Sequence, residues 1–117
     1  MDVQERNNGA VVILDVKRTD ADEPPGQNLL RDRLKSLLEG GRKFILLNVA
    51  DVTYVDSVLL SAIVQGYASA VRQGGMLKLL NVTPRLRKLL KITKLESVIE
   101  SYDSEEAATA TFPSKPT

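Results

Sequence analysis

The sequence predicts an α/β fold, with one domain, a mixed central sheet of about five strands, an N-terminal hairpin and four helices. The length of 117 residues fits one domain. Short runs rich in Val, Ile and Leu alternate along the chain with segments whose apolar residues recur at helical spacing. This alternation is typical of strands joined by right-handed helical crossovers, and Asn8-Gly9 near the N-terminus indicates a hairpin.

The hairpin is expected to join strands at residues 3–6 and 10–16. The intervening Asn7-Asn8-Gly9 accepts the positive φ values that tight hairpin turns require. Residues 19–26 contain two prolines and a glycine, so we expect them to form a loop.

The first helix is predicted from leucines at helical spacing, which would face the sheet: Leu30, Leu34, Leu37 and Leu38. Gly40-Gly41 supplies its stop signal. Residues 43–49 then form an apolar run with β-branched and aromatic members, which is typical of a strand covered on both faces. This run is the expected central strand.

A second helix is expected from Ser57 to about Arg72, ending before Gly74-Gly75. Apolar residues at helical spacing predict its inward stripe: Leu60, Ile63, Val64, Tyr67 and Val71. Residues 76–82 follow as a strand.

The C-terminal part is expected to form a helix, a short strand and a last helix. Thr83-Pro84 is a strong helix start, with Thr as the N-cap and Pro at the first helical position. The inner face of this third helix is assigned to Leu86, Leu89, Leu90 and Thr93. Residues 98–102 are predicted as the strand, and residues 103–106 as a capping box that opens a helix through about Thr111.

Composition excludes several classes of function. The chain has no Cys and no His, which removes thiol nucleophiles, disulfides, the usual zinc ligands and the commonest proton-transfer residue. The net charge is only +1 and aromatic residues make up 4% of the chain, so nucleic-acid recognition is not expected. The apolar runs are too short to span a membrane and no signal peptide is evident, so we expect a cytoplasmic protein without membrane insertion.

Candidate catalytic groups are few. Asp51 and Asp56 form a pair of acids that could serve acid/base or metal chemistry. The glycine pairs lie between a helix and the following strand, where they act as helix caps and do not cradle phosphate. We therefore predict no catalytic residue, no metal site, no cofactor and no enzyme activity. Nucleotide turnover that is lost in Asp56→Asn would contradict this prediction.

Basic residues gather on the predicted third helix: Arg85, Arg87, Lys88, Lys91 and Lys94. Such a face could meet a phosphate, an acidic protein surface or anionic lipid. We favour a solvated face, because basic residues in the second half of a helix also complement its dipole.

Asp56-Ser57 stands where the strand pattern gives way to a helical one. Asp and Ser are both among the best N-cap residues, so one interpretation is a structural cap. The other interpretation is a docking surface, because Val58, Leu59 and Ala62 are expected near the first turn, beside the inward stripe, with Val58 and Leu59 exposed. Both place the Ser57 hydroxyl at the helix start.

Residues 48–61 and 74–84, with the preceding Phe44-Ile-Leu-Leu, resemble the STAS domain (sulphate transporter and anti-sigma factor antagonist) of bacterial anti-sigma factor antagonists. The resemblance covers roughly residues 3–112 in the same order of elements. It identifies the chain as a single STAS-like domain at residues 1–112, followed by a flexible tail at residues 113–117.

The family's motif is Asp-Ser, then a small or hydroxyl residue, then Gly-Leu-Gly. Asp56-Ser57 and Leu60 match this motif. Leu59 and Ser61 stand where the family has Gly, and Thr19 stands where a Gly usually closes the second strand.

The resemblance implies an anti-sigma factor antagonist that binds an anti-sigma factor serine kinase. In phosphorylatable members this kinase modifies the Ser after the Asp, and a serine phosphatase reverses the modification. Ser57 occupies that position, with Ser61 and Thr53 as the next candidates. The expected partner-binding residues combine an acidic loop residue with the helix start: Asp22, Asp56, Ser57, Val58, Leu59, Ser61 and Ala62.

An alternative function is a STAS regulatory or scaffold subunit of a transporter or signalling complex, without phosphorylation. The replaced glycines favour this alternative. A neighbouring gene for a kinase and sigma factor would discriminate for the first function, and a transporter operon for the second. In either function we expect a monomer or a weak dimer.

Overall fold

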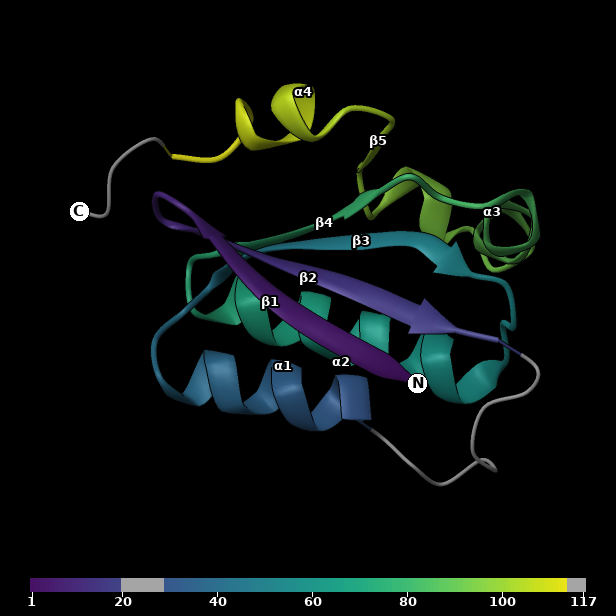
Figure 1. Cartoon of the computed structure of the whole chain (residues 1–117), viewed down its shortest axis with the longest axis horizontal. Coiled ribbons are helices and arrows are strands. Elements are labelled where there is room, and N and C mark those ends of the chain that lie inside the picture. Colours follow the sequence, from purple (N-terminus) through teal and green to yellow (C-terminus); the bar gives the residue numbers. More distant parts are fainter. Residues whose placement is uncertain (20–28, 114–117) are drawn as a thin grey trace.

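A computed structural model describes residues 1–19 and 29–113, and its centre is a sheet of five strands in the order β1-β2-β3-β4-β5 (Figure 1). β1 runs antiparallel to β2, whereas β2, β3, β4 and β5 are mutually parallel. The predicted mixed sheet with an N-terminal hairpin is thereby confirmed. The strand bounds are β1 Asp2–Asn8, β2 Val11–Arg18, β3 Phe44–Val52, β4 Met76–Leu80 and β5 Ser101–Tyr102.

In the described part of the chain, four α-helices flank this sheet, as predicted. They are α1 Leu29–Glu39, α2 Ser57–Arg72, α3 Pro84–Ile92 and α4 Glu105–Thr109. α1 and α2 lie side by side under one face, α4 covers part of the other face, and α3 lies beyond the end where the parallel strands finish (Figure 1). This arrangement places the β3–α2 connection and α3 at the same end of the molecule.

The hairpin turn lies one residue later than predicted. Asn8 pairs with Val11, so the two turn residues are Gly9 and Ala10. Gly9 has a φ of 61°. Glycine adopts this left-handed conformation without a steric penalty, which explains the position of the turn.

Both glycine pairs end helices as predicted. Gly41 and Gly74 have φ values of 83° and 78°. The following amides close the helix ends, because Arg42 N–H donates to the Leu37 carbonyl at 2.9 Å and Gly75 N–H to the Ala70 carbonyl at 2.7 Å. A hydrogen bond from the N–H of the residue after the glycine to the carbonyl five residues earlier is characteristic of a Schellman cap.

The sheet separates two apolar cores of unequal size. The larger core lies between the sheet and the helices α1 and α2, and it contains the four predicted leucines of α1. The smaller core lies on the opposite face, where Ala108 of α4 and Phe112 pack on Val11, Ile13, Leu46 and Leu80.

The prediction of which face of α2 turns inward is wrong, because the helix is rotated about its axis relative to the predicted stripe. The buried residues are Leu59, Ala62, Ile63, Gly66 and Ala70. Of the predicted stripe, Ile63 alone is buried, Leu60, Val64 and Tyr67 are half-buried, and Val71 is exposed. Small residues set the phase, because a Cβ on Gly66 would lie 2.8 Å from Leu34 Cδ1 and 3.1 Å from Leu77 Cδ1. α2 therefore turns its small side chains toward the closest contact.

The third predicted helix has the expected start and a narrower inner face. Thr83 is the N-cap and its hydroxyl oxygen accepts a hydrogen bond from Leu86 N–H at 3.3 Å. Leu86 and Leu90 are buried and Leu89 is half-buried. Thr93 is exposed, contrary to prediction, and its hydroxyl donates to the Leu89 carbonyl at 2.8 Å.

The C-terminal elements are shorter than predicted. A 3-10 helix, Leu95–Ser97, precedes the strand, which is limited to Ser101–Tyr102. The N-cap of α4 is Ser104, whose Oγ accepts from Ala107 N–H at 3.2 Å. Of the predicted tail, residues 114–117 lie outside the described residues.

Candidate functional site

The connection from β3 to α2 places Ser57 at the first position of α2, with its side chain exposed. Asp56 is the N-cap in extended conformation, and its Oδ1 accepts a hydrogen bond from Leu59 N–H at 2.9 Å. The predicted cap is thereby confirmed. It leaves the Ser57 hydroxyl without a hydrogen bond to any described residue.

A buried arginine fixes this cap. Arg18 Nη1 donates to Asp56 Oδ1 at 2.8 Å and Nη2 donates to Oδ2 at 3.1 Å, and the two side chains are 6% and 20% exposed. Planar, bidentate pairing of this kind fixes the orientation of a carboxylate and also stabilises its ionised form. The Arg18 guanidinium holds the pKa of the Asp56 carboxyl below its usual range, and the Leu59 N–H acts in the same direction. Asp56 is therefore ionised near neutral pH.

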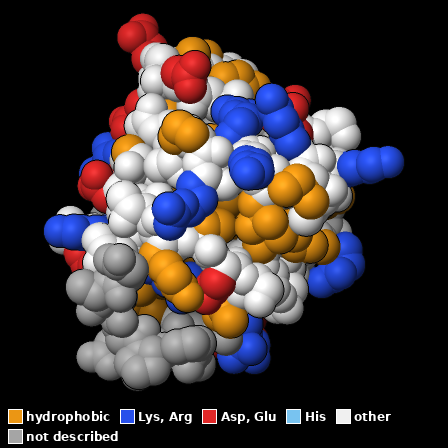
Figure 2. Space-filling model, turned by 90° about the vertical axis from the view of Figure 1, so that its right-hand side faces the viewer, with side chains coloured by type: hydrophobic (Ala, Val, Ile, Leu, Met, Phe, Trp, Pro, Cys, Tyr) orange, Lys and Arg blue, Asp and Glu red, His pale blue; other side chains and the backbone are white. Residues whose placement is uncertain are grey.

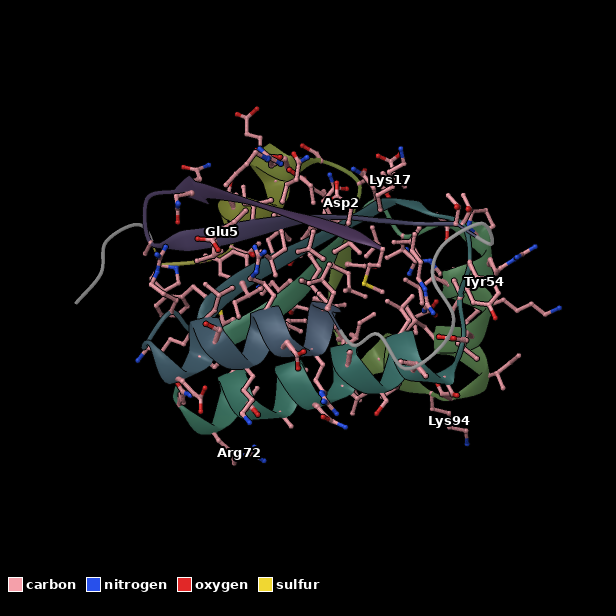
Figure 3. All side chains as sticks on the ribbon, turned by 60° about the horizontal axis from the view of Figure 1, so that its bottom comes forward. Asp2, Glu5, Lys17, Tyr54, Arg72 and Lys94 are labelled. Carbon is pink, nitrogen blue, oxygen red and sulfur yellow. The ribbon has the colours of Figure 1, made fainter. Side chains whose placement is uncertain are left out.

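Arg18 also organises the backbone of the loop before α2. Its carbonyl accepts hydrogen bonds from Thr53 N–H at 2.8 Å and Tyr54 N–H at 3.3 Å. Its guanidinium lies 5.0 Å from the centre of the Tyr54 ring, a cation–π distance. Figure 3 places Tyr54 at the end of the molecule opposite Arg72, the last residue of α2.

Sequence reasoning missed Arg18, although a signal was present. Val12, Leu14 and Val16 alternate along β2 toward the larger core. The same period of two places Arg18 on the buried face, and a buried arginine requires an acidic partner. That partner is 38 positions away in the chain, so spacing could not identify it.

The partner-binding residues predicted around Ser57 divide by burial. Leu59 is 1% exposed and Ala62 is 3% exposed, so the expectation that they lie on the surface is wrong. Both belong to the larger core, because α2 is rotated relative to the predicted phase. Ser57 and Ser61 are exposed and Val58 is half-buried. Asp22 lies outside the described residues.

Asp51 and Asp56, the candidate pair of acids, have different surroundings. Both Asp56 oxygens accept hydrogen bonds from Arg18, and Asp51 is exposed. Across residues 1–19 and 29–113, no group of three or more His, Cys, Asp or Glu side chains could hold a metal ion.

The basic residues of α3 have different surroundings. Arg85 Nη1 donates to the Thr53 carbonyl at 3.2 Å, which connects α3 to the loop before α2. Arg87 donates to Ser101 Oγ at 3.1 Å and lies 3.5 Å from a Glu96 carboxylate oxygen. The three lysines of this face are exposed: Lys88, Lys91 and Lys94.

Figure 2 views the end of the molecule that carries α3 and shows Lys and Arg side chains next to a group of hydrophobic ones. Lys94 points away from the body of the molecule (Figure 3). In the part of the chain that the structure describes, no helix has the length and apolar character needed to cross a membrane.

Comparison with known proteins identifies relatives of this fold. Residues 27–108 match the STAS domain. The anti-sigma-B factor antagonist of Bacillus subtilis (strain 168) is 38% identical over 72 residues, which are 62% of this chain. The matched segment spans 65% of that relative's length, just under two thirds.

Solved structures share the whole architecture at low sequence identity. An anti-sigma factor antagonist from Mycobacterium paratuberculosis has a TM-score of 0.80 at 14% identity, covering 95% of this chain and 92% of that one. The Bacillus cell fate determinant SpoIIAA in its phosphorylated form has a TM-score of 0.73 at 17% identity, covering 93% and 98%. At these identities the likeness establishes the fold. With most of its length matched, the chain belongs to the STAS domain family.

Proposed function

We propose that this protein is an anti-sigma factor antagonist that binds an anti-sigma factor serine kinase and is switched off by phosphorylation of Ser57. The observation that carries the proposal is the exposed Ser57 hydroxyl at the start of α2, directly after a cap that Arg18 holds in place. The similarity to the anti-sigma-B factor antagonist supports the partner class. The proposal places both proteins in the cytoplasm.

The surface proposed for the partner is the accessible part of the β3–α2 junction. Ser57 and Ser61 lie one turn apart on α2, with half-buried Val58 beside them. Asp56 supports this surface through its cap. Leu59 and Ala62 support it from below, and Asp22, which lies outside the described residues, remains a proposed contact.

Burial of Leu59 bears on kinase access. A bulky residue replaces the family's glycine there, but its side chain packs in the larger core. It therefore does not cover Ser57, so the replacement no longer favours the alternative of a STAS scaffold subunit that is never phosphorylated.

The chemical step is a phosphoryl transfer. Ser57 Oγ would form a bond to the γ-phosphorus of ATP while the bond to ADP breaks, and the hydroxyl proton would pass to a base of the kinase. A serine phosphatase would restore the hydroxyl by hydrolysis and release inorganic phosphate.

The fold should tolerate the added charge, whereas the interface should not. A phosphoserine carries about −1.5 to −2 charges near pH 7, and the amides and dipole at a helix N-terminus favour an anion there. Burial of that group against a partner surface without a matching cation would cost several kcal/mol, enough to abolish micromolar binding.

The test is phosphorylation of the purified chain by each anti-sigma factor serine kinase of the source organism, with labelled ATP. We expect Ser57→Ala to abolish labelling, whereas Ser36→Ala, which removes an exposed serine of α1, should be labelled like the wild type. Undiminished labelling of Ser57→Ala would assign the modification to Ser61 or Thr53. Absence of both binding and labelling with every kinase would contradict the proposed function.

A further inference from the structure

The surface beside Ser57 is hollowed between α1 and α2. The hollow has a volume of about 370 Å³ and is lined by Arg31, Ser57, Val58, Ser61, Ala62 and Gln65. Among the described residues that line it, Arg31, on α1, is the one with a formally charged side chain. Ser57, the residue proposed for phosphorylation, therefore shares a concave surface with Arg31 of the neighbouring helix.

Within residues 1–19 and 29–113, the charge of Arg31 is only weakly matched. Its Nη2 lies 3.6 Å from Asp32 Oδ1, on the next residue of α1, and the Arg31 side chain is 52% exposed. Charge-assisted hydrogen bonds between such groups are typically about 2.7–2.9 Å long, so this contact is loose.

Two other arginines near the β3–α2 junction already have hydrogen-bond partners outside the hollow. Arg18 is buried and bidentate on Asp56, and Arg85 donates to the Thr53 carbonyl. Of the three, Arg31 is the one whose guanidinium is free to turn toward a new anion in the hollow.

The α2 side of the hollow supplies neutral donors. Ser61 and Gln65 follow Ser57 at intervals of four residues, so all three lie along one face of the helix. Gln65 Nε2 donates to Ser61 Oγ at 3.0 Å. That bond occupies a lone pair of Ser61 Oγ and leaves its hydroxyl proton to donate to another acceptor. A guanidinium, a hydroxyl donor and a helix start together match the chemistry of a phosphoryl group.

Resting on the phosphorylation proposed above, we infer that Arg31 binds the phosphoryl group on Ser57 and bridges α1 to α2 in the modified protein. The guanidinium fork matches two phosphate oxygens. This pairing favours the dianion, so it lowers the second pKa of phosphoserine below its usual value of about 6.

The test uses full-length protein with phosphoserine incorporated at position 57 during translation. Phosphorus NMR during a pH titration measures the second pKa of this phosphate. We expect the pKa in the otherwise wild-type protein to be lower than in Arg31→Gln by about 0.5 to 1 unit, a shift reduced from that of a buried pair by solvent screening. Arg31→Lys should give an intermediate value, because it keeps the charge and loses the fork.

The matched control is Lys35→Gln, which removes an exposed positive charge from the same helix but from outside this hollow. Its phosphoserine should titrate like the wild type. Equal pKa values in wild type and Arg31→Gln, or an equal rise in both variants, would overturn the inference. Circular dichroism of the unmodified variants checks the fold. Because translation installs the phosphate, the titration tests Arg31 whether or not a kinase modifies Ser57.

Discussion

At the scale of single residues, the Asp56 carboxylate joins two functions, since it caps α2 and pairs with buried Arg18. The folded protein lowers the pKa of this carboxyl, whereas an Asp carboxyl in the unfolded chain has a pKa of about 3.9. A depressed pKa contributes stability above the unfolded value, and this stability is lost as the pH falls through the folded value. We expect Asp56→Asn to lower the free energy of unfolding by about 2 kcal/mol at pH 7, and the deficit to shrink below about pH 4.

Urea unfolding of both proteins between pH 7 and pH 3 measures this deficit. Asn also caps helices well, so the comparison isolates the charge from the cap. Other carboxyls, such as Asp15 with its lowered pKa, titrate in both proteins and cancel in the difference. A deficit that stays constant over this range would show that the ion pair is not its cause.

At the scale of elements, Gly75 joins the end of α2 to the start of β4. A Cβ at this position would lie 2.2 Å from the Lys43 carbonyl oxygen, which accepts from Met76 N–H at 2.9 Å. We expect Gly75→Ala to destabilise the protein by about 3 kcal/mol, because backbone must move to relieve the clash. The matched change Gly40→Ala meets ordinary contacts of 3.5 Å and should alter stability by no more than about 0.5 kcal/mol. Urea unfolding of the two variants compares them, and equal losses would contradict the close approach at Gly75.

At the scale of the whole molecule, the two cores divide the chain into parts of unequal stability. Phe112 belongs to the smaller core, which holds α4 on the sheet, and Leu47 lies in the larger core. We expect Phe112→Ala to accelerate hydrogen exchange mainly in α4, because α4 itself contributes only Ala108 to this core. Leu47→Ala should lower the free energy of unfolding by about 3 to 5 kcal/mol and reduce hydrogen-exchange protection throughout the molecule. If each variant lost as much hydrogen-exchange protection in β3 as in α4, this result would show that α4 unfolds only with the whole molecule.

Much of the fold could be predicted because strong local signals agreed with one another. The α1 leucines, the glycine stops and the Thr83-Pro84 start each depend on neighbouring residues, and the structure retains all of them. The phase of α2 could not be predicted in this way, because apolar residues occupy most of its length and several stripes have similar character. The position of Ser57 was predictable, because consecutive residues mark the change from strand to helix.

By itself, the sequence determined the order of the elements, the helix ends and a serine at the start of the second helix, because local spacing and caps encode these features. The tertiary structure alone decided which side of α2 faces inward, because Gly66 and its small neighbours permit close packing only in that phase. It also decided the environment of Ser57. Arg18 and Arg31 come from β2 and α1, elements distant in sequence from Ser57, and only folding brings them to the start of α2.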